Sequence, residues 1–199
     1  RQWEADQTYI HNTKPRLRGQ IFDAERMLAD NSAHLETVAK VFPNGEFKKI
    51  TIGKMQFDSV DAMSDFIKDF NKKIREESDR IKDNANSNYN SKLVVNIDGL
   101  DFVVHTEMTK ETTSKGVNIF SKTTRKMYYS QDELGLKNVP IKQGLLRNGI
   151  EDIVLNVITG HDFAERIDTL NQNIARYKSD LELILARDGK PFEFEKELE

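Results

Sequence analysis

The sequence contains no cysteine among its 199 residues. Disulfide bonds, zinc sites with thiolate ligands, iron–sulfur clusters and cysteine nucleophiles are therefore excluded. Long apolar runs are also lacking, because no stretch approaches the roughly 20 apolar residues that cross a bilayer, and the first residues do not form a signal peptide. These absences are typical of a protein of the reducing cytoplasm, and we expect a cytoplasmic chain with no membrane association.

Neither sign of charge dominates the sequence. It carries 30 lysines and arginines against 33 acidic residues, for a formal net charge of −3. This balance excludes a globally basic nucleic-acid binder, although it leaves room for a local basic patch. The chain begins with Arg1 rather than methionine and stops within the helix-like sequence FEFEKELE, so we expect it to be a piece of a longer polypeptide.

Motifs of catalysis are also lacking. Gly144 and Gly149 bracket GLLRNG, but no Lys-Ser or Lys-Thr follows, so this is not a phosphate-binding loop. There is no nucleophile elbow and no Asn-Pro-Pro-aromatic signature of adenine methylases. His105 precedes Glu107 by two residues in a predicted strand, which favours either an ordinary surface pair or a His–carboxylate pair. We predict that the chain itself is not an enzyme and holds no metal or cofactor.

Heptad patterns occupy both ends of the chain. In the C-terminal pattern the gaps alternate between four and three residues, as on one face of a coiled-coil helix. Its apolar residues are Phe163, Ile167, Leu170, Ile174, Tyr177, Leu181 and Ile184. A second stripe of the same spacing comprises Ile10, Lys14, Leu17, Ile21, Ala24, Leu28, Asn31, Leu35 and Val38. We predict long helices over residues 15–40, with a kinked helical lead-in before Pro15, and over residues 162–187.

Two interpretations of the long helices stay open. Their equal length favours an antiparallel pair within one chain, and the alternative is a coiled-coil homodimer through one or both seams. Asn31 is likewise either a polar break that faces a loop or water, or a buried amide that fixes the register of the pair.

Short strands are predicted between the two long helices. ITIGKMQF reads as a hairpin, residues 60–81 as an amphipathic helix, and LVVNI and DFVVHTE as a hairpin about Asp98-Gly99. VNIFS and KMYYS are two further strand candidates, joined by residues 122–125, and the polar segment 108–116 is expected to be a hairpin tip. The fold class is therefore α+β, with an antiparallel sheet of about six short strands and an inserted helix.

The predicted organisation is one module in three parts. Residues 1–45 carry the first long helix, residues 46–131 the sheet with its inserted helix, and residues 132–199 a C-terminal helical region. This region is expected to pair with the first helix, so that the two heptad-patterned helices flank the sheet.

One local excess of positive charge stands out. From Lys110 to Arg147 the chain has eight basic and three acidic residues, with Tyr128 and Tyr129 among them. Basic and aromatic side chains on a sheet track a phosphate backbone and stack on bases, whereas lysines on a solvated edge also discourage edge-to-edge pairing. The candidate nucleic-acid-binding residues are Lys110, Lys115, Lys122, Arg125, Lys126, Lys142 and Arg147.

The order of the C-terminal segments also carries a family resemblance. A helix rich in Asn and Ile precedes the heptad helix. The heptad helix is followed by Lys190-Pro191-Phe192 and then by a segment of acidic residues and leucine, from Glu195 to Leu198. Further upstream, the segment ITIGKMQFDS precedes another predicted helix. From about residue 16 to 199 this arrangement resembles the C-terminal region of very large mobile-element proteins of conjugative transposons and phages, notably in Bacteroides-like bacteria. Those proteins combine an adenine-specific DNA methylase-like domain with a Swi/Snf-type or DEAD-box-like helicase.

The resemblance implies a non-catalytic accessory module of a DNA-processing protein, since the helicase and methylase motifs are not in this chain. Its expected partners are DNA and the other domains of a larger parent protein. The alternative is a scaffolding or protein-interaction module that acts through its coiled-coil helices, with a homodimer as one form of it.

Overall fold

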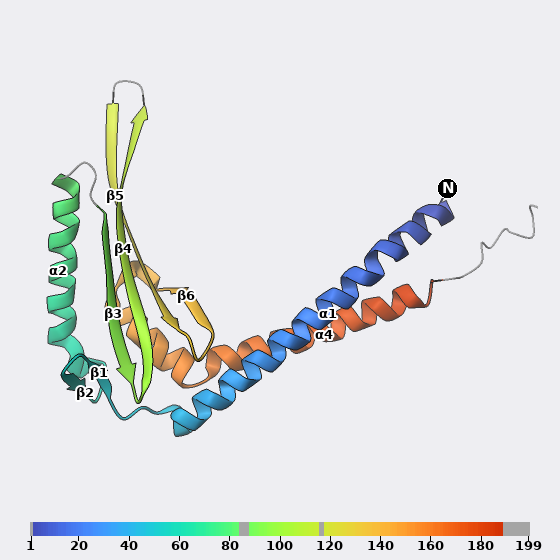
Figure 1. The fold of residues 1–199 in the computed structure, drawn as a ribbon, viewed down its shortest axis with the longest axis horizontal. Helices are drawn as coiled ribbons and strands as arrows, with labels where there is room; N and C mark the ends of the chain where they lie inside the picture. Colours follow the sequence, from blue (N-terminus) through green and yellow to red (C-terminus); the bar gives the residue numbers. More distant parts are fainter. Residues whose placement is uncertain (1, 84–87, 116–117, 189–199) are drawn as a thin grey trace, which may run out of the picture. The chain divides into compact units, whose positions relative to one another are not determined.

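The chain folds into an α+β arrangement of a six-stranded antiparallel sheet and four α-helices, two of them long, within the residues described (Figure 1). The computed structural model describes the backbone of residues 2–83, 88–115 and 118–188, and the side chains of 7–82, 88–110 and 122–188. Residues 1–33 and 163–199 form one compact unit, the helical unit, and residues 34–162 form another, the sheet unit. No helix in the described ranges is long and apolar enough to cross a bilayer.

The helical unit contains most of α1 (Gln2–Val41) and α4 (His161–Leu185), which lie side by side (Figure 1). Every predicted seam position in this unit is buried or half-buried. Ile10 and Leu17 of α1 form a cluster with Ile184, against which Tyr177 and Leu181 pack. Two ion pairs flank this contact, Lys14–Asp188 at 2.6 Å and Glu25–Lys178 at 2.8 Å. Along these contacts the residues of α1 meet those of the C-terminal segment in opposite sequence order, Lys14 with Asp188 and Glu25 with Lys178.

The beginning of α1 corrects one expectation. The sequence predicted a main helix from Pro15 with a kinked lead-in, but α1 begins at Gln2 and continues through Pro15. Proline removes one helical hydrogen bond, to the carbonyl of His11. Both Pro15 and His11 are exposed, so water can satisfy that carbonyl. Asn31 is half-buried and its Nδ2 donates to the carbonyl of Met27 at 2.7 Å, as expected of a polar break rather than of a bond between helices.

The sheet unit is built on strands in the order β2-β1-β3-β4-β5-β6, with every neighbouring pair antiparallel. The strands are β1 (Ile50–Ile52), β2 (Met55–Phe57), β3 (Tyr89–Ile97), β4 (Leu100–Lys115), β5 (Asn118–Gln131) and β6 (Leu136–Pro140). The predicted inserted helix is confirmed as α2 (Ser64–Asp83), which follows a 3-10 turn at Asp61–Met63. The short α3 (Leu146–Asp152) continues into a π-helical segment, Ile153–Ile158.

The number of strands matches the expectation, but two of the strands are not those predicted. VNIFS and KMYYS belong to one continuous strand, β5, and the predicted tip at 108–116 lies largely within β4. Beyond Met108 and Arg125 the described backbone of these two strands pairs only with itself, and the frequent threonines of this segment suit an extended backbone. The sixth strand is β6, which the sequence assigned to the approach to the C-terminal helices.

One face of the sheet is covered and the other is open. On the covered face, Ile74 and Ile81 of α2 pack with Met108 of β4. Phe102 and Tyr129 lie edge to face on the same side, and the Tyr129 hydroxyl donates to Asp152 at 2.9 Å. Since side chains alternate along a strand, the intervening residues of β3, β4 and β5 form what we call the open face.

Candidate nucleic-acid interface

A row of paired residues crosses the open face of the sheet. Lys92 of β3 pairs with His105 of β4, His105 with Tyr128 of β5, and Tyr128 with Pro140 of β6. The His105 and Tyr128 rings are stacked, with centroids 4.8 Å apart and planes 13° from parallel. The row therefore places an aromatic pair between an exposed lysine and the short edge strand.

Tyr128 is held from two directions. Its hydroxyl donates a hydrogen bond to the carboxylate of Glu107, and its ring lies on His105. The hydrogen bond to Glu107, with desolvation and the negative charge of Glu107, raises the pKa of Tyr128 above 10.0. His105 and Glu107, which the sequence placed on one side of a strand, therefore both act on Tyr128.

Three of the seven predicted basic residues lie close together on β5. Lys122, Arg125 and Lys126 are exposed, and none of the three forms an ion pair with any side chain that the structure describes. Lys122 and Lys126 share the open-face side of β5 with Tyr128, because they differ from it by even numbers of residues. Lys142 is also exposed, in the 3-10 turn Lys142–Gly144 after β6.

The remaining predicted residues have other surroundings. Lys110 Nζ donates to the carbonyl of Lys82 at 2.6 Å, so its charge lies at the C-terminal end of α2. Arg147 forms ion pairs with Glu151 at 2.7 Å and with Asp61 at 2.5 Å. The hydrogen bond to Glu151, and then the one to Asp61, raise the pKa of Arg147. The backbone of Lys115 pairs with Asn118, and its side chain lies outside the described residues.

A cavity lies beside the aromatic pair, at the end of β6, and we call it the β6 pocket. It has a volume of about 410 Å³ and is lined by β5, the end of β6 and the following turn. Tyr128 and Pro140 contribute apolar surface, Arg125 and Lys126 positive charge, and other lining residues amide groups. Sequence analysis did not find this pocket, although PIKQG in the segment after β6 carries a turn signal.

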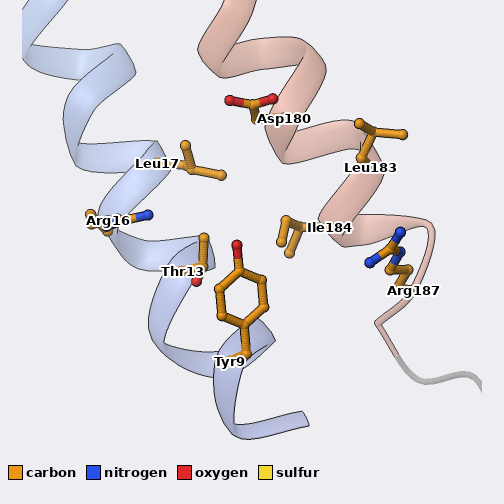
Figure 2. Close-up of a pocket in the computed structure, with 8 residues that line it drawn as sticks. All are labelled: Tyr9, Thr13, Arg16, Leu17, Asp180, Leu183, Ile184 and Arg187. Carbon is orange, nitrogen blue, oxygen red and sulfur yellow. The ribbon is translucent and has the colours of Figure 1, made fainter. Parts of the chain in front are cut away.

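The helical unit has a separate hollow of about 280 Å³ between α1 and α4. Figure 2 shows the Tyr9 ring beside Thr13 and Leu17 of α1, with Ile184 of α4 across from it and Arg187 in the turn that follows α4. The lining mixes apolar side chains with a single carboxylate, that of Asp180. Across the described ranges no three His, Asp or Glu side chains gather as metal ligands.

The described geometry thus places Lys122 and Lys126 on the same face of the sheet as the stacked aromatic pair, and Arg125 and Lys126 at the β6 pocket. Lys110 interacts instead with the C-terminal end of α2, and Arg147 with Glu151 of its own helix and with Asp61 of the 3-10 turn before α2. Comparisons of the chain with family models, with curated proteins and with solved structures found no match.

Proposed function

We propose that this chain is a non-catalytic accessory module that binds DNA through the basic side of β5 and the open face of the sheet unit. The observation that carries the proposal is that two exposed cations, Lys122 and Lys126, share a face of the sheet with the stacked rings of His105 and Tyr128. A third exposed cation, Arg125, lies between them on the same strand and lines the β6 pocket. When lysine and arginine side chains neutralise DNA phosphates, the counterions condensed on the DNA are released, and this release drives binding.

The long ribbon of β4 and β5 supports the same proposal. Past Met108 and Arg125 the two strands pair, among the residues that the structure describes, only with each other, and Figure 1 shows them reaching beyond β3 and β6. A two-stranded ribbon fits the major groove of B-form DNA. The ribbon sequence contains Lys110, Lys115 and Lys122 against one acidic residue, Glu111, so its charge favours contact with phosphates.

The family resemblance gives the proposed context. It is a resemblance to the C-terminal region of helicase–methylase proteins of mobile elements, in which the motor and methylase motifs lie elsewhere. In that context this module would hold DNA near catalytic domains that it does not itself contain. The proposed partners are DNA and those other domains, in the cytoplasm.

A charge-reversal experiment on the full chain tests the proposal. We expect labelled DNA to bind at low salt, with an affinity that falls steeply as salt rises. The triple variant Lys122→Glu, Arg125→Glu and Lys126→Glu should weaken binding by at least about tenfold, because three phosphate contacts become repulsions. Fluorescence anisotropy measures both effects.

A matched control lies on the outer face of α2. Lys72, Lys73 and Arg75 are also two lysines and one arginine, and all three are exposed. Their reversal to glutamate changes the net charge by the same amount, so it corrects for the general effect of charge on DNA affinity. Equal losses in the two triple variants, or no DNA binding in low salt, would contradict the proposed function.

A second candidate function is association through the helical unit. Large apolar side chains stay exposed on both of its helices, including Phe22 at 66%, Met27 at 50% and Leu183 at 61%. The proposed helix pair would then present these side chains, which lie outside its seam, to other domains of the parent protein or to a second copy. Sedimentation equilibrium of the wild type and of Phe22→Ser tests self-association, since a monomer at every concentration removes the homodimer.

A further inference from the structure

We propose that the β6 pocket binds an unpaired base of single-stranded DNA together with its phosphate. This inference rests on the proposed function and narrows it to a DNA strand whose bases are free. The pocket lies on the sheet unit where β6 ends, next to the basic residues of β5. Its components match the separate parts of a nucleotide: a ring face, cations and amide groups.

The ring face comes from Tyr128. His105, on β4, lies against one face of the tyrosine ring, and Pro140, on β6, pairs with Tyr128 from the other side. Pro140 and Tyr128 line the pocket and His105 does not, so the part of the tyrosine ring that His105 leaves uncovered forms an apolar wall against which a base can stack. Stacking on an aromatic side chain stabilises the binding of any of the four bases, because every base has a flat aromatic face. The bond to Glu107 holds the ring in place before a base arrives.

The phosphate site comes from Arg125 and Lys126. Both line the pocket, and no carboxylate belongs to its lining, which consists wholly of described residues. A Cβ built on Gly144 would lie 3.4 Å from Arg125 Nε, so the guanidinium packs against the turn after β6. The positive charge is thereby positioned at the pocket and accepts a phosphate with little loss of side-chain freedom.

Two side-chain amides complete the pocket. Asn138 and Gln143 both line it, and an amide offers a donor and an acceptor to the edge of a base. The Gln143 Oε1 accepts a bond from Asn148 at 3.4 Å, which leaves its NH₂ group for a ligand. Paired bases in a duplex use these edges for each other and bury their faces by stacking, so only an unpaired base can enter.

The backbone that carries the amides adopts an uncommon conformation. Asn138 has φ of 51°, Gln143 of 58° and Gly144 of 58°, and all three line the pocket. Non-glycine residues at positive φ carry a backbone cost and occur often at ligand sites. Here the turn is fixed by the bond from Gly144 N to the Ile141 carbonyl at 3.1 Å and by that from Asn138 N to Ser130 Oγ at 3.0 Å. The pocket is therefore preformed.

The test compares three labelled probes of equal length on the full chain: single-stranded DNA, its duplex, and a strand with abasic sites. We expect the single strand to bind more tightly than the other two in anisotropy titrations. Tyr128→Ala should weaken single-strand binding by about five- to a hundredfold, the equivalent of one lost stacking contact, and should leave duplex binding unchanged. Tyr128→Phe keeps the ring and should retain most of the affinity.

Two further variants separate the pocket from general effects on the fold. Gln143→Gly removes the amide at a position where glycine tolerates the positive φ, so it should fold and still weaken single-strand binding severalfold. Leu155→Ala truncates an exposed residue of the π-helical segment Ile153–Ile158, outside both the pocket and the open face, and should change nothing. If DNA binds, but Tyr128→Ala and Gln143→Gly leave single-strand affinity intact, the pocket inference is overturned and the proposed function stands. Absence of all DNA binding would overturn both.

Discussion

Tyr128 on β5 and Glu107 on β4 are joined by a hydrogen bond that crosses the sheet diagonally, since Glu107 pairs with Lys126 and Tyr128 with His105. The bond draws the Glu107 carboxylate toward the phenol rather than toward Lys126, with which no ion pair forms among the described side chains. The ammonium group of Lys126 is therefore available to form an ion pair with a ligand, and the Tyr128 ring is held beside His105.

This relationship predicts a shift in the titration of Tyr128. Replacing Glu107 by Gln removes the carboxylate, so the raised pKa of Tyr128 should fall back toward 10.0. Because the pKa is raised in the folded state, the associated stability is fully present below pH 10.0 and is lost as pH rises through the folded pKa. Ultraviolet absorbance titrations of the wild type and of Glu107→Gln measure the shift; superimposable curves would contradict it.

A second prediction concerns the salt dependence of DNA binding. Lys126→Gln should reduce the slope of log affinity against log salt by about 1, because one phosphate contact is lost. Arg147→Gln should leave the slope unchanged, since Glu151 and Asp61 already neutralise that guanidinium. Anisotropy titrations at several salt concentrations give both slopes. An equal change in the two variants would mean that Arg147 contacts DNA, as its sequence position alone predicted.

Thr106 gives a third prediction, on stability. Its hydroxyl is buried on the covered face and has no hydrogen-bond partner among the described residues. Thr106→Val keeps the shape and removes the unsatisfied group, so it should raise the free energy of unfolding by about 1 kcal/mol. Thr109→Val, at an exposed position on the same strand, should change it little. Urea denaturation followed by circular dichroism provides the comparison, and a less stable Thr106→Val would refute the prediction.

How far the sequence predicted the fold depended on the range of the interactions. The heptad spacing of Ile10, Leu17 and Ile184 is a local property of helices, and these residues are buried together in the helical unit. Strand β6 was missed because its sequence, LKNVP, is short and contains asparagine and proline. It forms as an edge strand because β5 offers it a partner, which single-segment patterns do not reveal.

The candidate site was predictable only in part for the same reason. Excess positive charge near β5 is visible in the sequence, and Lys122 and Lys126 are indeed exposed there. The spacing of Arg147 and Glu151 predicts the ion pair that they form. That Arg147 also meets Asp61, 86 residues away in sequence, depends on the packing of α3 near α2 and is not visible in the sequence. The β6 pocket likewise requires the strand order and the positive φ of Gln143, which local patterns do not specify.

The last prediction concerns two glycines within helices, Gly149 of α3 and Gly19 of α1. A Cβ on Gly149 would lie 2.6 Å from Cδ1, 3.0 Å from Cγ1 and 3.2 Å from Cγ2 of Ile141, whereas one on Gly19 would meet nothing within 4 Å. Alanine favours a helix over glycine by about 1 kcal/mol, but overpacking a core costs about 1–3 kcal/mol. Gly19→Ala should therefore stabilise the helical unit by up to about 1 kcal/mol.

In Gly149→Ala the overpacking outweighs the helix preference, because Ile141 is β-branched and buried and cannot easily turn away. We expect a net loss of about 1 kcal/mol in the free energy of unfolding of the sheet unit. Urea denaturation measures both variants, and the double change Gly149→Ala with Ile141→Val, which shortens the contacting side chain, should recover part of the loss. If Gly149→Ala stabilised the protein as Gly19→Ala does, the contact between α3 and the end of β6 would be looser than described. In that case Ile141, which lines the β6 pocket, would not be held rigidly in place, and the pocket would not be preformed on that side.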